Sequence, residues 1–375
     1  MKIVLVHNQR FGGAHRRTSE QFKQLGLPVT EVTLEGAQPL TEDAVIVPIS
    51  YYGDRPPQSV RPITRYADFL SLLSAYRRLH TTVRKLAPDV IWLNPCRFLK
   101  GAWLEKDLAS ITAYYCDEAR RSDYDDSVRH STRVRTRIPY WPMRRATRYL
   151  DRATVASVAA VATNSSYSAD QITRAYGRQA EVIPCGVSGY FRPATGHVSR
   201  DYLLSVGSLI PTKGHDLAIR AAGQCGLNLP IVVVAPRDDA KEVERLGSIA
   251  TQSGVEMTVK IGVSDGELAM LYQSALVTLY LAQREPFGLV SIEAQSCGSP
   301  VIVSNEGGLP ETVVPGVTGW AVARKADDVA ARLALFSNRQ LAEALGAAAS
   351  AHAAQWSWSV SAARLRNVIE SVYRA

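Results

Sequence analysis

The sequence has few cysteines and no low-complexity tract. Its five cysteines are scattered and never form a Cys-x-x-Cys pair: Cys96, Cys116, Cys185, Cys225 and Cys297. An odd, scattered set argues against both a disulfide framework and a thiolate zinc site. We therefore expect a protein of a reducing compartment, most simply the cytoplasm.

Long apolar runs are missing as well. The weakly polar stretch at residues 153–163 is too short, and too rich in alanine and threonine, to span a bilayer. The apolar run at residues 3–6 is too short for a signal peptide and leads directly into His7 and Asn8. This run predicts a first buried strand and no export signal.

What the chain does have is length and a globular composition. Its 375 residues exceed the size to which one core usually grows, so two domains are expected. Apolar residues make up 46% and charged residues 21%, which is typical of a globular protein and not of a disordered one. The formal net charge of +8 favours anionic ligands or surfaces without naming one.

Strand and helix patterns alternate along both halves, which predicts α/β domains with parallel sheets covered by helices on both faces. The expected strands lie at residues 2–7, 44–49, 89–94, 110–115, 155–163, 181–184, 202–206, 230–235, 255–261, 276–281 and 300–304. Residues 189–200, which are polar and contain proline and glycine, are expected to link the two halves. Ligands of such sheets bind beyond the carboxyl ends of strands, where four turns fall: Gly12-Gly13, Lys213-Gly214, Glu285 to Gly288 and Gly307-Gly308.

The most informative stretch is REPFGLVSIEA at residues 284–294. It follows an apolar run, and Pro286 is predicted to open a helix because its missing N–H is not needed there. Gly288 then leaves the first free amides of that helix open to an anion such as phosphate. Glu293, farther along the helix, suits the paired hydroxyls of a ribose. The alternative is a buried helix with two acidic residues near its start.

With these residues in view, the sequence resembles the family-4 retaining glycosyltransferases of the GT-B fold. The Glu-x7-Glu motif is intact from Glu285 to Glu293, with Pro-Phe-Gly-Leu inside it. Similar segments are VGSLIPTKG at residues 206–214, GGLPE at 307–311, Gly12-Gly13 and residues 162–187. The resemblance implies two Rossmann-like domains facing across a cleft, residues 1–195 plus 357–375 and residues 196–356. It also implies a C-terminal helix that crosses back to the first domain.

The same resemblance implies a retaining transferase of hexosyltransferase type that uses a nucleotide diphosphate sugar, with either UDP or GDP, as co-substrate. Glu285 would hold donor sugar hydroxyls where positive charge develops, and Glu293 would bind the ribose. Lys213 would neutralise the diphosphate leaving group. Charges fixed in advance at such points are usually the largest catalytic contribution.

Main-chain groups supply the remaining donor contacts that the resemblance implies. The turn at Phe287-Gly288-Leu289 would present amides to the sugar and the diphosphate. The amides of Gly12-Gly13 would close on the diphosphate or on the acceptor from the opposite domain. Base contacts are expected from the turn at Gly262-Val263, where main-chain groups do most of the recognition.

Ser208 departs from the family pattern in the segment that binds the diphosphate. Relatives commonly have an arginine at this position, paired with the lysine that corresponds to Lys213. The motif therefore supplies one cation instead of two. Arg237, Arg284 or an arginine of the first domain is a candidate substitute, and weaker donor binding is the alternative.

Asp117 is the second departure, because relatives place a histidine in this turn. An ordinary aspartate is an anion at neutral pH. Asp117 is therefore a catalytic candidate that could stabilise positive charge on the donor or orient the acceptor, but it cannot donate to a sugar hydroxyl. The reaction class does not need a protein base here, since the departing phosphate can accept the proton of the acceptor. An acceptor more nucleophilic than an alcohol, such as a thiol or an amine, becomes an alternative. His7 and His130 are candidates for the acceptor side or ordinary structural histidines.

Metal ions are not expected to take part. Asp123-Tyr124-Asp125 matches the Asp-x-Asp signature of metal-dependent glycosyltransferases of another fold, but short acidic triplets arise by chance. A helix start explains Asp238-Asp239. With a lysine and helix amides on the diphosphate, no divalent cofactor is required.

The expected partners are a nucleotide-sugar donor and a small-molecule or glycan-precursor acceptor. Nucleic acid is not expected, because the basic residues gather in one segment, residues 120–152, without a recognised module. That segment is a solvated surface, an anionic acceptor site or a surface for peripheral contact with lipid headgroups. Alternative functions are a sugar-nucleotide epimerase or hydrolase, and a non-catalytic relative that binds nucleotide sugars. Intact Glu285, Glu293 and Lys213 argue against the non-catalytic alternative.

Overall fold

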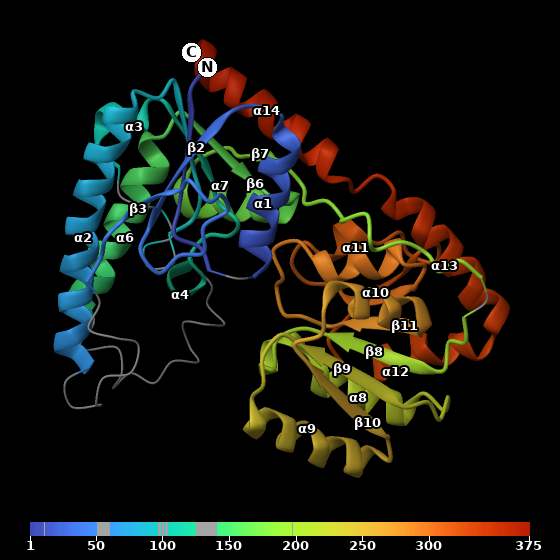
Figure 1. The fold of residues 1–375 in the computed structure, drawn as a ribbon. Helices are drawn as coiled ribbons and strands as arrows, with labels where there is room; N and C mark the ends of the chain where they lie inside the picture. Colours follow the sequence, from blue (N-terminus) through green and yellow to red (C-terminus); the bar gives the residue numbers. More distant parts are fainter. Residues whose placement is uncertain are drawn as a thin grey trace. The chain divides into compact units, whose positions relative to one another are not determined.

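The computed structural model describes residues 1–375 apart from 11, 51–60, 97, 98, 100, 102, 103, 125–140 and 197; for 61–63 and 122 it describes the backbone alone. The chain divides into two compact units. We call Met1–Pro184 with Ser361–Ala375 the first unit and Cys185–Val360 the second unit. Each unit holds a parallel sheet covered by helices (Figure 1). The predicted α/β class with two Rossmann-like sheets is therefore confirmed.

In the described part of the first unit, seven parallel strands follow the order β3-β2-β1-β4-β5-β6-β7. The strands are β1 (Ile3–His7), β2 (Val29–Leu34), β3 (Val45–Val47), β4 (Val90–Leu93), β5 (Thr112–Tyr115), β6 (Ala160–Thr163) and β7 (Glu181–Val182). The helices are α1 (Gly13–Leu25), α2 (Arg61–Leu86), α3 (Lys106–Ala109), α4 (Arg121–Tyr124), α6 (Trp141–Ser157), α7 (Ser166–Tyr176) and α14 (Trp358–Arg374), whose first residues belong to the second unit. The order reverses between β1 and β4, and ligands of open parallel sheets bind at such a switch point.

Alternate residues of the first strand explain why both faces of this sheet are covered. Val4 and Val6 point into an apolar cluster under α2, whereas Ile3 and Leu5 point into a second cluster on the other face. The second cluster includes residues of α1 and of α14. A period of two is what a strand buried on both faces requires. The expected return of the C-terminal helix to the first sheet is thus confirmed.

In the described part of the second unit, six parallel strands follow the order β10-β9-β8-β11-β12-β13. The strands are β8 (Tyr202–Val206), β9 (Ile231–Ala235), β10 (Met257–Ile261), β11 (Ala275–Tyr280), β12 (Val301–Ser304) and β13 (Gly319–Val322). The helices are η3 (Pro211–Lys213), α8 (His215–Gln224), α9 (Ala240–Ser253), α10 (Asp265–Ser274), α11 (Leu289–Ser296), η4 (Leu309–Thr312), α12 (Ala326–Leu333), η5 (Ala334–Ser337) and α13 (Arg339–Ala353). The switch point of this sheet lies between β8 and β11.

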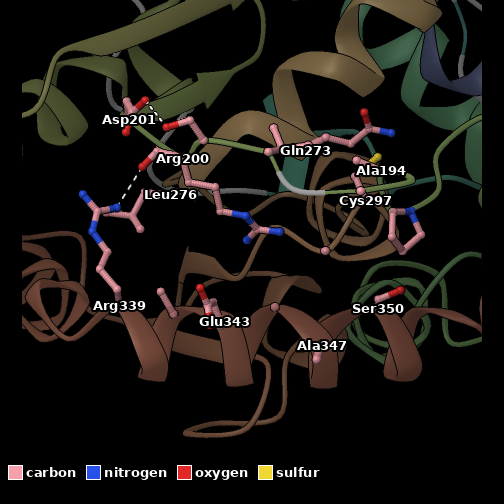
Figure 2. A pocket seen from close by; sticks show the side chains of 17 residues that line it. Ala194, Arg200, Asp201, Gln273, Leu276, Cys297, Arg339, Glu343, Ala347 and Ser350 are labelled. Atoms are coloured by element: carbon pink, nitrogen blue, oxygen red, sulfur yellow. Dashed lines mark hydrogen bonds between the residues drawn. The ribbon is translucent and has the colours of Figure 1, made fainter.

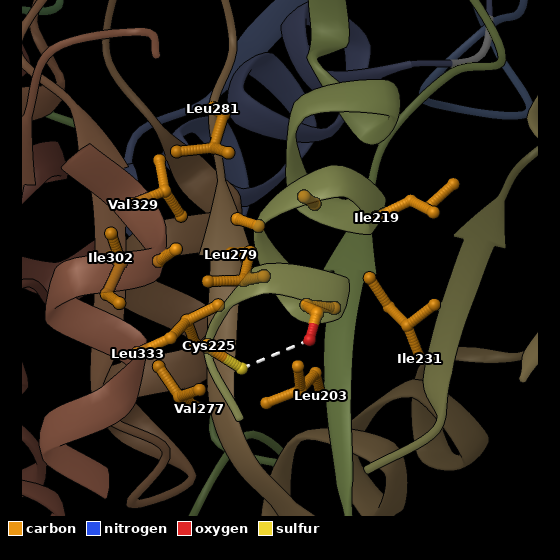
Figure 3. Packing of buried hydrophobic residues seen from close by; sticks show 14 of the residues in the cluster. Leu203, Ile219, Cys225, Ile231, Val277, Leu279, Leu281, Ile302, Val329 and Leu333 are labelled. Atoms are coloured by element: carbon orange, nitrogen blue, oxygen red, sulfur yellow. Dashed lines mark hydrogen bonds between the residues drawn. The ribbon is translucent and has the colours of Figure 1, made fainter. Parts of the chain in front are cut away.

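A fully buried apolar cluster holds α8 and α12 against the second sheet. Figure 3 shows Leu279 and Ile302 of the strands beside Val329 of α12, and Ile231 of β9 beside Ile219 of α8. All five have no exposed side-chain surface. Burying an aliphatic side chain of this size contributes about 1.5–3 kcal/mol. This packing fixes the strands, and with them the loops that leave their carboxyl ends.

Two sequence expectations about elements were wrong or incomplete. The strand expected at 155–163 begins only at Ala160, because Val155 lies in α6, where it is buried on the same helical face as Asp151. Strands β2 and β13 were not predicted. In β2 a buried carboxylate, Glu31, interrupts the apolar pattern. In β13 the first residue is Gly319, where an added Cβ would lie 1.8 Å from the Val301 carbonyl oxygen.

Candidate active site

Two loops meet at the switch point of the second sheet, one after β8 and one after β11. Gly214 follows β8 with φ 76°, and a Cβ added there would lie 2.4 Å from the Leu281 carbonyl oxygen. The Gln283 amide donates to the Thr212 carbonyl at 2.7 Å. Only glycine allows this backbone approach, which places Lys213 beside the segment that carries Glu285.

Lys213 and Glu285 form an ion pair at this switch point, although 72 residues separate them in the sequence. Lys213 Nζ lies 2.8 Å from Glu285 Oε2 and donates to the Tyr280 hydroxyl at 3.1 Å. The two charged side chains keep 20% and 23% of their surface exposed, so both are accessible to a ligand. Tyr280 was not expected here, since the last aromatic residue of an apolar strand carries no signal in the sequence.

The loop after β12 holds Glu285 from the other side. Gly308 N donates to the Glu285 carbonyl at 2.8 Å. Gly307 has φ 70°, and a Cβ on it would lie 2.2 Å from that same carbonyl oxygen. Arg284 adopts φ 47°, a conformation that is costly for a residue with a side chain. Three strand-end turns predicted as site candidates therefore converge on one residue.

Gly307→Ala tests this support against a matched control. Gly316 also has a left-handed φ, 77°, but no atom lies within 4 Å of an added Cβ. Both substitutions incur the same left-handed strain, whereas only Gly307→Ala collides with Glu285. We expect Gly307→Ala to lower the free energy of unfolding by about 1–3 kcal/mol more than Gly316→Ala does. Equal losses in thermal or urea unfolding would contradict the proposed support.

The helix α11 begins at Leu289 and not at Pro286, so the prediction that Pro286 opens the helix was wrong. The N-cap is Gly288, whose φ of 117° lies outside the helical region, and Pro286 lies in the turn before it. A Cβ on Gly288 would meet Leu309 Cδ2 at 2.5 Å, which explains why glycine ends the turn there. By helix geometry the amides of Leu289 and Val290 have no intrahelical acceptor.

The side chain of Phe287 does not belong to this open surface. It is buried against Cys185, Ile292 and Trp358, with its ring edge-on to Trp356 at 5.5 Å between centroids. Its role is to anchor the turn that presents the amides of Gly288 and Leu289. With the Phe287 ring buried, the backbone groups of this turn remain available to a ligand.

Glu293 lies in the second turn of α11 and is only 5% exposed. The Tyr272 hydroxyl donates to its Oε2 at 3.3 Å. Burial raises the pKa of Tyr272 well above its ordinary value, so this hydroxyl remains a donor at neutral pH. Tyr272 orients the carboxylate and could not be identified from the sequence, where it is one aromatic residue of a short helix.

Ser208, Gly262 and Val263 also lie at carboxyl ends of the second sheet. The Ser208 carbonyl accepts from His215 Nε2 at 3.3 Å, while His215 Nδ1 accepts from the Ser205 hydroxyl at 2.8 Å. Burial lowers the pKa of His215, so this ring is neutral. Gly262, with φ 63°, donates its amide to the Ala235 carbonyl at 2.8 Å, and Val263 packs on the core.

In the first unit, Asp117 is paired with a buried arginine. Arg17, of α1, is 1% exposed, and its Nε donates to Asp117 Oδ1 at 3.0 Å. The same guanidinium donates to Asn94 and to Gln21, each at 2.8 Å, and lies 3.6 Å from the centroid of the Tyr115 ring. Asp117 is thus an ion-paired carboxylate. Sequence reasoning missed Arg17, because an arginine in an amphipathic helix usually marks a solvated face.

The remaining candidate residues of the first unit are two glycines at the start of α1 and two histidines. Gly12 is the N-cap of α1 and Gly13 its first residue, and both are exposed. Both ring nitrogens of His7 have partners inside the protein: Nε2 lies 2.8 Å from Glu31 Oε1, and Nδ1 accepts from the Gln9 amide at 3.2 Å. Burial works against ionisation of Glu31, but hydrogen bonds from His7 and from the turn after β2 outweigh it and lower its pKa. His130 lies outside the described residues.

The acidic pairs considered as metal ligands have other partners. Asp239 is the N-cap of α9 and accepts from the Glu242 amide, as expected for a helix start. Asp123 accepts from Arg144 at 2.9 Å, and Asp125 lies outside the described residues. Over the part of the chain that the structure describes, no group of three or more His, Cys, Asp or Glu residues is arranged to hold a metal ion. Within that same part, no helix is both long and apolar enough to cross a membrane.

Two family models match the chain in succession. Residues 15–188 match the model described as Glycosyltransferase Family 4, and residues 191–352 match the one described as Glycosyl transferases group 1. A curated relative, the D-inositol 3-phosphate glycosyltransferase of Streptosporangium roseum, is 33% identical over 231 residues, 55% of this chain and 53% of the relative. The enzyme of the same name from Actinosynnema mirum is 33% identical over 54% of this chain and 55% of the relative. The chain spans about half the length of the curated relatives it matches.

Solved structures resemble the fold over the whole chain. Sucrose-phosphate synthase from Thermosynechococcus elongatus has a TM-score of 0.75 at 20% identity, covering 100% of this chain and 99% of that one. The Anabaena protein HepE, solved in complex with UDP and glucose, has a TM-score of 0.73 at 16% identity, covering 99% and 100%. At these identities the likeness concerns the fold alone.

Proposed function

The chain belongs to the family-4 and group-1 glycosyltransferases, and on this premise we propose that it is a retaining hexosyltransferase. It moves a sugar from a UDP- or GDP-sugar to a small-molecule or glycan-precursor acceptor. The observation that carries this proposal is the accessible Lys213–Glu285 ion pair at the switch point of the second sheet. The complex of HepE with UDP and glucose supports a nucleotide-sugar donor, and the names of the curated relatives make a phosphorylated polyol the first acceptor to test.

The proposed chemistry follows from where charge develops. The bond between the anomeric carbon and the phosphate oxygen breaks, and its electron pair stays on the departing diphosphate. Lys213 and the free amides at the start of α11 stabilise that negative charge, while Glu285 faces the positive charge on the sugar. The nucleophilic atom of the acceptor forms a bond to the anomeric carbon on the face from which the diphosphate departs. The proton of the acceptor passes to the departing phosphate oxygen. These groups make the step independent of a metal ion.

Transfer assays with a panel of UDP- and GDP-sugars and acceptors test the proposal. We expect product only when donor and acceptor are both present, with the anomeric configuration of the donor retained in the NMR spectrum of the product. Donor loss that is independent of any acceptor would indicate an epimerase or hydrolase. Thermal stabilisation by donors without any turnover would indicate a non-catalytic relative. Full loss of activity in a chelator would contradict metal independence.

Glu293→Gln is expected to weaken binding of the selected nucleoside diphosphate by about 10–100-fold. Hydrogen bonds to a charged group contribute about 1.5–3 kcal/mol, and the amide keeps the shape of the side chain while removing that charge. Tyr272→Phe is the matched control, because it removes the hydroxyl that contacts Glu293 and leaves the carboxylate. Calorimetric titration measures both variants. Unchanged affinity in Glu293→Gln would show that Glu293 does not bind the ribose.

A further inference from the structure

A cavity of about 530 Å³ lies at the amino-terminal edge of the second sheet (Figure 2). Its lining includes residues just before β8, the start of β11, the carboxyl end of α11 and one side of α13. β8 and β11 are parallel neighbours, so this edge is opposite to the one that carries Lys213 and Glu285. Pockets for small organic molecules typically measure about 300–1,000 Å³. The cavity is therefore large enough for a ligand and separate from the donor site.

Arg200 extends its side chain into this cavity (Figure 2). Its Nη1 is buried and has no hydrogen-bond partner among the described residues. Arg339, from α13, donates at 2.8 Å to the main-chain carbonyl of Arg200. Burial lowers the pKa of Arg200, and the charge of Glu343 acts against this effect through space.

Two glycines make room for the guanidinium. A Cβ on Gly346 would lie 3.1 Å from Arg200 Nη1 and 2.5 Å from the Gly298 carbonyl oxygen. A Cβ on Gly298, which has φ 77°, would lie 3.3 Å from Arg200 Nη2. Much of the remaining lining is small or apolar, as in Ala194 and Ala347. The missing side chains of these two glycines thus let the guanidinium pack directly against the wall of the cavity.

An unsatisfied buried N–H on a charged group is expensive. Such a group costs at least about 1–3 kcal/mol, and native structures hold few of them outside functional sites. Cys297 and Gly298, at the carboxyl end of α11, line the cavity together with Arg200, and the helix dipole attracts a cation to the carbonyls at that end. That attraction alone does not explain a cavity around the guanidinium or an Nη1 that bonds to none of these carbonyls.

We propose that this cavity binds a small organic anion, whose phosphate or carboxylate group pairs with Arg200 and whose body lies along the small side chains of α13. The anion supplies the acceptor that Nη1 lacks. Glu343 at the rim disfavours highly charged ligands and so favours a singly or doubly charged one. The site is independent of the sugar-transfer function proposed above.

Thermal unfolding of the full chain with two probes tests this site. Phenyl phosphate and benzoate share a ring and differ in their anionic group, and chloride at equal ionic strength is the reference. We expect at least one probe to raise Tm by about 2 °C or more at saturation, and the probe that does so identifies the anion class. The shift should persist in Lys213→Met, which alters the donor site, and disappear in Arg200→Met.

Arg220→Met is the matched control, because Arg220 is an exposed arginine of α8 in the same unit. It should keep the probe-induced shift. Without a probe, Arg200→Met should be at least as stable as Arg220→Met, since it removes an unpaired buried charge. Glu343→Gln should strengthen probe binding by removing a nearby negative charge.

Four outcomes would overturn the proposal. The first is the absence of any shift in the wild-type chain, and the second is an equal shift in Arg200→Met. The third is a lower Tm of Arg200→Met than of Arg220→Met without a probe, which would assign Arg200 to the end of α11. The fourth is a clear loss of stability in Glu343→Gln without a probe, which would indicate an internal ion pair between Glu343 and Arg200.

Discussion

Lys213→Met is expected to lower kcat/KM for sugar transfer by about 10²–10³-fold. Removing one fixed group that stabilises charge developing in a transition state typically has this effect. Lys213 pairs with Glu285 at 2.8 Å, and methionine keeps much of the apolar length of the lysine side chain. Lys241→Met, on the exposed side of α9 in the same unit, makes the same change in net charge and should leave kcat/KM within about threefold.

In Lys213→Met, comparing kcat with the affinity for the nucleoside diphosphate separates an effect on chemistry from an effect on binding. If Lys213 acts on the leaving diphosphate, kcat falls more than the affinity for the nucleoside diphosphate does. A cycle with Glu285→Gln then measures the coupling between the two side chains. We expect the double variant to lose less than the product of the single losses, because the two charges act as a unit. Comparable kcat/KM in Lys213→Met and Lys241→Met would contradict the assignment of Lys213.

The part of the site that could be predicted follows from topology. Parallel strands bring their carboxyl ends to one edge, so the turns at Lys213, Glu285 and Gly307 had to be neighbours once the strands were recognised. The contacts that fix their distances could not be predicted. They depend on glycines that allow a backbone carbonyl to approach, as Gly214 does at Leu281, and a sequence records the glycine without its neighbour.

Two of the features that were missed, β2 and the Arg17–Asp117 pair, share one physical cause, which is burial of polar groups in the first unit. Glu31 lies inside β2 and is satisfied by His7 and the following turn, so this strand with a buried carboxylate was not predicted. Arg17 is separated from Asp117 by 100 residues, and nothing in either local pattern pairs them. Pairwise satisfaction of buried charges is a tertiary property, and periodicity does not reveal it.

Each sheet carries a cation–carboxylate pair at the edge where its strands end, yet the two pairs differ in exposure. Lys213 and Glu285 are 20% and 23% exposed, whereas Arg17 is 1% exposed and Asp117 is 19% exposed. The first pair offers both charges to a ligand. In the second pair only part of the Asp117 carboxylate is exposed, and Arg17 already compensates its charge. We therefore expect Asp117 to act as an orienting acceptor of hydrogen bonds, whereas a histidine at this position would face a buried cation.

Arg17→Met should be among the most destabilising single substitutions in the first unit, lowering the free energy of unfolding by about 3 kcal/mol. Removing one partner of a buried ion pair leaves the other charge uncompensated, at a cost of about 3–5 kcal/mol, and the partial exposure of Asp117 keeps the loss at the lower end. Arg174→Met, on the exposed side of α7 in the same unit, is the matched control and should cost less than about 0.5 kcal/mol.

Adding Asp117→Asn to Arg17→Met should recover part of that loss, because it removes the carboxylate charge that Arg17 no longer compensates. Asp117→Asn alone should destabilise, since it leaves the Arg17 guanidinium buried without its anion. Urea unfolding of the three variants completes the cycle. We expect the double variant to lose less stability than the sum of the two single losses. Additive losses would mean that Arg17 stabilises the first unit through Asn94, Gln21 and the Tyr115 ring, with Asp117 free to act as an unpaired anion toward the acceptor.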